Sequence, residues 1–211
     1  MTATKRTRTG RPTLDEAPQI EARLRQAAVE TFLEHGFDAT TMDAVAKAAG
    51  ITKRTLYAHY PDKRTLFANA ITWAIERHPW KKPPSGVSPA DLADALAAIA
   101  RSTLEVAHDP DVVRLVRMGM TESKRFPDVA TRIESLTVVP FTQAVVDLLN
   151  QHACAGTVVV EDVEIAADQF LSMVTATSTR LAAFGITRPP KVERRHLEHA
   201  VKLFLNGVLP R

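Results

Sequence analysis

The segment 41–60 of the sequence, TMDAVAKAAGITKRTLYAHY, restricts the fold more than any other part of the chain. It contains two short runs with the apolar spacing of a helix, and each run follows a threonine, Thr41 or Thr52, that can act as an N-cap. Gly50 lies between the runs and can adopt the left-handed backbone conformation of a tight turn. This spacing predicts a helix-turn-helix over residues 41–60.

The remaining sequence also shows the periodicity of helices rather than that of strands. A predicted helix from Ile20 ends at Gly36, and Asp62 is expected to cap a longer helix after the hairpin. The β-branched run 157–160 is too short for a strand without a partner, so we interpret it as a loop. Hydrophobic residues make up 45% of the 211 residues, which is enough for a core, and the prediction is an all-α fold. Further helices are predicted at about residues 88–107, 110–124, 127–136, 140–155, 163–184 and 192–208.

A proline-rich connection divides the chain into two predicted domains. Residues 79–89 contain four prolines and a glycine, which favour an irregular segment. Ser88 is expected to cap the first helix of the second domain, with Pro89 in its first turn. The predicted parts are a basic flexible arm, a helical domain that contains the helix-turn-helix, and a larger helical domain, at residues 1–19, 20–80 and 88–211.

All of the net charge of +3 lies in the first third of the chain. Residues 66–211 carry equal numbers of basic and acidic side chains, whereas the first eleven residues are basic and contain no acid. Such a cluster suits a polyanion such as nucleic acid, because it can neutralise phosphates and release counterions. Charge alone supports a solubilising tail equally well. The basic residues are Lys5, Arg6, Arg8 and Arg11.

The other chemistry-bearing residues are few. A single cysteine, Cys154, excludes an intramolecular disulfide and a cysteine-based zinc site. We expect a cytoplasmic protein with no membrane partner, because neither a signal peptide nor an apolar run of about 20 residues is visible. His196 and His199 share a predicted helix without an evident third ligand, so no metal or other cofactor is predicted. P-loop and nucleophile-elbow motifs are missing, so we do not expect an enzyme, and a catalytic second domain is the alternative.

The second helix of the hairpin would present a dense row of hydrogen-bond donors. In the major groove of DNA these donors could reach base edges and phosphates. A solvated polar face on a structural hairpin would have the same composition. The row consists of Thr52, Lys53, Arg54, Thr55, Tyr57 and His59.

The segment Ile20–Trp80 resembles the DNA-binding domain of TetR-family regulators. The resemblance rests on AAVETFLEHGFDATTMDAVAKAAGITKRTLYAHYPDKRTLF at residues 27–67, which contains the family's F-x-x-x-G, L-Y-x-H-Y and K-x-x-L patterns. It implies a transcriptional repressor that acts as a homodimer on a palindromic double-stranded DNA operator and that a small-molecule inducer releases. A constitutive DNA-binding protein without a ligand is a further alternative.

The resemblance assigns roles to individual positions. It implies that Thr41 and Lys63 contact phosphates and that Tyr60 packs under the hairpin. Arg11, in the basic arm, would enter a minor groove, although Thr9 stands where the full arm motif has arginine. The complete predicted DNA-binding set is Arg11, Thr41, Thr52, Lys53, Arg54, Thr55, Tyr57, His59, Tyr60 and Lys63.

The second domain resembles the AefR-like C-terminal domains of the same family in two runs, ESKRFPDVA at 122–130 and AADQFLSMV at 166–174. By this resemblance the last two helices form the dimer interface, and an inducer pocket lies between the helices of residues 88–184. Apolar residues expected to be divided between interface and core are Phe170, Leu171, Val174, Leu203 and Phe204. Candidate pocket residues, which would equally suit a plain core, are Trp73, Met118, Phe126, Phe141, Met173 and Phe184.

Overall fold

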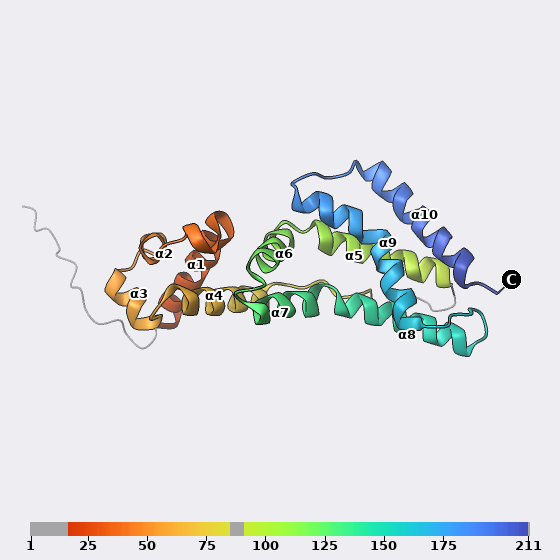
Figure 1. The fold of residues 1–211 in the computed structure, drawn as a ribbon, viewed down its shortest axis with the longest axis horizontal. Helices are drawn as coiled ribbons and strands as arrows, with labels where there is room; N and C mark the ends of the chain where they lie inside the picture. Colours follow the sequence, from red (N-terminus) through yellow and green to blue (C-terminus); the bar gives the residue numbers. More distant parts are fainter. Residues whose placement is uncertain (1–16, 85–90, 211) are drawn as a thin grey trace, which may run out of the picture. The chain divides into compact units, whose positions relative to one another are not determined.

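The structure, a computed structural model, describes residues 17–84 and 91–210 of a chain that divides into two compact units, 1–77 and 78–211. Every regular element in the described ranges is an α-helix, which confirms the predicted all-α fold (Figure 1). None of these helices combines the length and apolar character that crossing a membrane requires. The first unit contains α1 (Ala17–Ala39), α2 (Met42–Ala48), α3 (Lys53–His59) and α4 (Lys63–Arg77). The second unit contains α5 (Leu92–His108), α6 (Pro110–Glu122), α7 (Pro127–Thr137), α8 (Val139–Cys154), α9 (Val163–Ala183) and α10 (Pro190–Val208).

The first unit is built around α1, which packs against α2 and α4, while α2 packs against α3. Phe32, Phe37 and Phe67 form its aromatic centre. The Phe67 ring meets the rings of Phe32 and Phe37 edge to face, at centroid distances of 5.0 and 5.2 Å. Gly36 has φ 79° and ψ 172°, so the regular part of α1 ends there, as the sequence predicts. This break lets the chain return Phe37 to the cluster that Phe32 begins.

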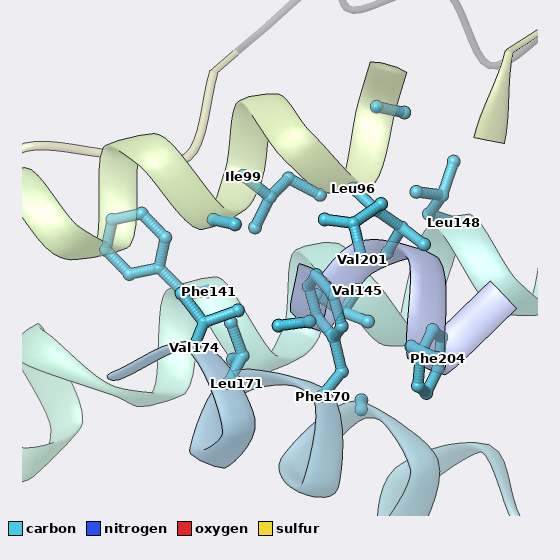
Figure 2. Close-up of a cluster of buried hydrophobic side chains, with 14 of the residues drawn as sticks. Leu96, Ile99, Phe141, Val145, Leu148, Phe170, Leu171, Val174, Val201 and Phe204 are labelled. Atoms are coloured by element: carbon cyan, nitrogen blue, oxygen red, sulfur yellow. The ribbon is translucent and has the colours of Figure 1, made fainter. Parts of the chain in front are cut away.

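The second unit holds its core between α5, α8, α9 and α10 (Figure 2). Phe141 from α8 and Phe170 and Val174 from α9 are completely buried. The Phe170 ring lies 4.9 Å, between centroids, from the ring of Phe204 on α10. Burying apolar side chains from four helices removes their surface from water, and this is the main force that holds the unit together.

Side-chain caps fix where helices begin. Asp62 accepts a hydrogen bond from the Thr65 N–H at 2.7 Å and caps α4, as predicted. The predicted cap of α5 at Ser88 is wrong: Asp91 caps this helix by accepting from the Asp94 N–H at 3.1 Å, and Ser88 lies outside the described residues. Serine and aspartate cap helices about equally well, so the sequence pattern did not separate the two starts.

Most of the apolar residues expected to be shared between core and interface fill the core. Leu171 and Phe204 are buried together with Phe170 and Val174, whereas Leu203 is 53% exposed. These four side chains come from α9 and α10 and contact the same cluster (Figure 2). Within the second unit, most of the apolar face of α10 is therefore buried in the core.

The segment 157–160 forms no strand, as the sequence analysis predicts. Val158 is buried in the core of the second unit. The Val159 N–H donates to the backbone oxygen of Val208 at 2.8 Å, so the segment is fastened to the end of α10. A β-branched run is used here as a core-anchored loop.

A close contact between α6 and α7 provides a test of the packing. A Cβ atom added to Gly119 would lie 2.8 Å from Cδ1 of Ile133, which is buried. Alanine favours a helix over glycine by about 1 kcal/mol, but at Gly119 the end of the Ile133 side chain must first move aside. Gly119→Ala should therefore raise the free energy of unfolding, measured by urea denaturation, by less than the same change at a helix position without such a contact. Ile133→Val removes Cδ1, so the double variant should be more stable than the sum of the two single effects.

Gly207 on α10 provides the matched control, because nothing lies within 4 Å of a Cβ atom added there. Gly207→Ala should leave the stability unchanged or raise it by up to about 1 kcal/mol, because alanine favours the helix. Equal effects of the two alanine substitutions would contradict the contact between Gly119 and Ile133.

Candidate DNA-binding interface

Two threonine caps and a glycine turn shape the α2–α3 hairpin, as the sequence predicts. Thr41 Oγ1 accepts from the Ala44 N–H and Thr52 Oγ1 accepts from the Thr55 N–H, each at 3.1 Å. Gly50, between the helices, has φ 67°, in the left-handed region. Each helix therefore begins at a residue type that suits an N-cap, and the turn between them requires no strained side chain.

The hairpin has one buried face and one exposed face. Val45 of α2 and Leu56 of α3 are completely buried. A helix of seven residues is not stable alone, so this packing fixes the orientation of α3. The opposite face carries the predicted donors: Tyr57 is 50% exposed, and Thr55 is half-buried at its edge. The other exposed members of the row are Thr52, Lys53, Arg54 and His59.

Tyr60 ties the end of α3 to α1. Its hydroxyl oxygen accepts a hydrogen bond from Arg25 Nε at 3.1 Å, and the same guanidinium pairs with Glu21. The hydrogen bond to Tyr60 is the main reason that the pKa of Arg25 is raised. Tyr60 is 5% exposed, in agreement with the predicted packing under the hairpin. Its burial favours a positioning role over the direct DNA contact that was also predicted.

Backbone carbonyls surround the ammonium group of Lys63 at the start of α4. Nζ donates to the carbonyl oxygens of Phe37, Asp38 and Thr40 at 2.9, 3.1 and 3.0 Å, and it lies 4.6 Å from the centre of the Phe37 ring. Because an ammonium has three donors, all of them are engaged. Lys63 thus joins the start of α4 to the chain that follows the break at Gly36. A contact with phosphate would require the ammonium to release one of these carbonyls.

An ion pair connects the two helices of the hairpin. Nζ of Lys53, the first residue of α3, bonds to Oδ2 of Asp43 in the first turn of α2. The two side chains are 64% and 56% exposed, so the pair lies in solvent at the edge of the donor row. One of the predicted base-reading cations is therefore held by a neighbouring carboxylate.

Three residues that hold or flank this interface were not predicted from the sequence: Arg25, Thr40 and Asp43. Thr40 is 1% exposed, and its hydroxyl donates to the Gly36 carbonyl at 2.7 Å. For Asp43 a signal was available, because it is the only acidic residue in the segment 41–60. Arg25 and Thr40 offered no comparable signal, since their contacts depend on how α1 packs.

Arg11 and Trp73 are the last two predicted site residues that precede the second unit in the sequence. Arg11 of the basic arm lies outside the described residues. Trp73, predicted to line an inducer pocket, belongs to α4 of the first unit, where the Arg77 guanidinium lies 5.2 Å from the centre of its ring. Trp73 therefore does not belong to the second unit, in which the pocket was predicted.

The other predicted pocket residues differ in burial within the second unit. Met118, Phe126 and Phe141 are buried, Met173 packs on the core, and Phe184 is 76% exposed. A groove of about 470 Å³ lies between α5 and α10. Its lining contains none of the predicted residues and consists of Ala93, Asp94, Ala97, Arg101, Leu197, Glu198, Val201, Lys202, Leu205, Asn206 and Leu209.

Comparison with known proteins identifies the class of this chain. Residues 24–70 match the family described as bacterial regulatory proteins of the tetR family, and residues 94–207 match the C-terminal domain of AefR-like transcriptional repressors. The helix-turn-helix and the second helical unit thus define a regulatory protein of the helix-turn-helix class. The chain belongs to the TetR family of transcriptional regulators, with a C-terminal domain of the AefR-like type.

Individual relatives agree with this assignment. The solved structure of the flavonoid-responsive regulator FrrA is 32% identical with a TM-score of 0.69, over 92% of this chain and 99% of that one. A TetR regulator of Agrobacterium tumefaciens has a TM-score of 0.72 at 23% identity, over 92% and 96% of the two chains, and shares the fold. The transcriptional regulator UidR of Escherichia coli K12 is 30% identical over 131 residues, or 60% of this chain. That match spans 64% of the length of UidR.

The three carbonyl contacts of Lys63 predict a measurable contribution to stability. Lys63→Met keeps the stem over Phe37 but removes the donors, so the free energy of unfolding should fall by about 1–3 kcal/mol. Lys47→Met, at an exposed position of α2, should change it by less than about 0.5 kcal/mol. Chemical denaturation followed by circular dichroism measures both. Equal effects would contradict the structural role of the Lys63 ammonium.

The cap of α4 predicts a dependence of stability on pH. The backbone N–H of Thr65 holds the pKa of Asp62 below its usual value of 3.8. The charged cap therefore stabilises the fold above this pH, and its contribution is lost as the pH falls through the lower folded-state pKa. The difference in stability between the unaltered protein and Asp62→Ala should shrink on acidification from about pH 6 to about pH 3.

Asp62→Asn is the control for this titration, because asparagine keeps a capping oxygen but does not ionise. Its advantage in stability over Asp62→Ala should stay constant over the same range of pH. If the unaltered protein also kept a constant advantage over Asp62→Ala, the charge of the cap would be irrelevant.

Proposed function

We propose that this chain is a cytoplasmic, DNA-binding transcriptional repressor that acts as a homodimer on a palindromic operator and is released by a small-molecule inducer. The observation that carries the proposal is the row of exposed donors on α3, set on a hairpin whose reverse face is buried around Leu56. Such a helix can enter the major groove, where base edges present a distinct pattern of donors and acceptors.

The residues of α3 fall into two groups according to the part of the DNA that each could contact. Lys53, Arg54 and Thr55, in the first turn, would contact base edges or the adjacent backbone, and Tyr57 and His59 would contact the backbone or bases one turn later. Thr41 and Thr52 use their oxygens as caps, and these hydroxyls can also donate to phosphates. Lys63 would reach a phosphate only by releasing a carbonyl, and Arg11 would reach a minor groove from the arm.

Two copies of the chain would give the proposed repressor its specificity. One α3 reads only a few base pairs, whereas a two-fold dimer reads two half-sites about 34 Å apart. Apolar side chains around the end of α9 and along α10 are left exposed and would suit a face between copies. They are Phe184, Ile186, Val192 and Leu203.

An aromatic small molecule is the inducer class that we propose to test first, because FrrA, which is 32% identical over 92% of this chain, is described as flavonoid-responsive. Met118, Phe126, Phe141 and Met173 remain the candidate contacts in the second unit, since methionine and aromatic side chains adapt to planar ligands. A constitutive DNA-binding protein would bind the same operator and ignore all such compounds.

The proposal is tested by selecting bound sequences from a random duplex library and measuring the affinity of the full-length chain for the selected duplex by fluorescence anisotropy. We expect a two-fold symmetric sequence, bound more tightly than generic DNA by about 10³-fold or more, and a dimer in sedimentation. A panel of flavonoids should weaken this binding. Failure to enrich any sequence, or a monomer at micromolar concentration, would overturn the corresponding part of the proposal.

Variants separate the proposed base contacts from backbone contacts. Thr55→Ala and Lys53→Ala should change the base preference of the selected sequences, costing about 1–3 kcal/mol on the original operator. Lys63→Ala should weaken binding to all duplexes alike and lower the slope of log affinity against log salt by about 0.9 per phosphate contact. An unchanged slope for Lys63→Ala would leave this residue with its carbonyl contacts as its only role.

A further inference from the structure

The ion pair between Lys53 and Asp43 has a consequence for how tightly the proposed DNA surface binds DNA. Lys53 opens α3, where it would meet base edges, and its Nζ is bound to the Asp43 carboxylate on α2. Asp43 is the only acid in the segment 41–60, whose other charged side chains are Lys47, Lys53 and Arg54. The hairpin therefore holds one of its three full positive charges neutralised in the free protein.

The free energy of the ion pair decides whether Lys53 can leave Asp43 when DNA binds. The two side chains are 64% and 56% exposed, and ion pairs in solvent contribute only about 0–1 kcal/mol. Lys53 can therefore exchange Asp43 for a base edge or a phosphate without a large loss. A buried pair of the same geometry would be too costly to separate and would serve only the fold.

The exchange has the same cost on every DNA. Whether Lys53 turns to a base edge at an operator or to a phosphate on generic DNA, it must first leave Asp43, and the released carboxylate would lie near the negative backbone. Because this cost is set in the free protein, Asp43 lowers the affinity for operator and generic DNA alike.

We propose that Asp43 is a restraining residue, which holds Lys53 on α2 in the free protein and thereby lowers the affinity for DNA of any sequence. This inference rests on the proposed DNA-binding function and adds a residue that opposes binding. Asp43 also lies in the first turn of α2, where an acid favours the helix. Its removal can therefore change stability, so the deciding measurement is DNA affinity as a function of salt.

The experiment uses the full chain and a generic random-sequence duplex, titrated by fluorescence anisotropy at about 50 to 300 mM salt. Asp43→Asn should bind generic DNA about twofold to fivefold more tightly, because the pair no longer has to be broken. The slope of log affinity against log salt should steepen by about 0.9 for each Lys53 that reaches a phosphate. On the selected operator the gain should be of similar size, because the same pair has to be separated there.

Two controls keep this result specific to the pair. Glu34→Gln makes the same change of net charge at an exposed position on α1 and should leave the salt slope unchanged. In a Lys53→Met background, Asp43→Asn should bring little further gain, because no lysine is left to release. A gain of full size in that background would overturn the inference and assign the effect to the general charge of Asp43.

The outcomes separate this inference from the function on which it rests. If the unaltered protein binds no duplex at the lowest salt, the proposed function fails and the inference fails with it. If the unaltered protein binds DNA and Asp43→Asn binds generic DNA with the same affinity and slope, only the role of Asp43 is overturned. Thermal unfolding of each variant, measured in parallel, shows whether the fold is intact.

Discussion

The burial of Leu56 is the interaction on which the proposed interface depends. The helix α3 has seven residues and could not persist by itself, so its exposed donors hold a direction only because Leu56 is inserted into the first unit. Tyr60 fastens the other end of α3 to Arg25 of α1, and Lys63 fastens the next helix to the chain after Gly36. The helix that carries the polar chemistry is thus held by contacts on its opposite side.

Local chemistry made this hairpin readable from the sequence. The caps at Thr41 and Thr52 and the turn at Gly50 each depend on residues within a few positions, and all three were predicted. The contacts of Lys63 and Arg25 were not, because they join residues more than twenty positions apart whose approach is decided by tertiary packing. The exposed donors of α3 could be predicted from the sequence, but the pairing of Lys53 with Asp43 could not.

The roles of residues in the second unit were harder to predict from the sequence, because the same residue type can serve a core, an interface or a pocket. Apolar residues such as Phe170 and Phe204 suit a core and an interface equally, and only the packing shows that they fill the core. The start of α5 was misplaced because two good capping residues lie three positions apart. Met118, Phe126 and Phe141 are likewise buried, as core residues are, although they were also candidates for a pocket.

The approach of Ile133 to Gly119 ties the residues at two distant positions to each other. Because glycine has no side chain, α7 can come close to α6 here, and Cδ1 of the buried Ile133 occupies space that a larger residue at position 119 would need. Among relatives, the residues at these two positions should therefore vary together, with a larger residue at 119 accompanied by a shorter one at 133.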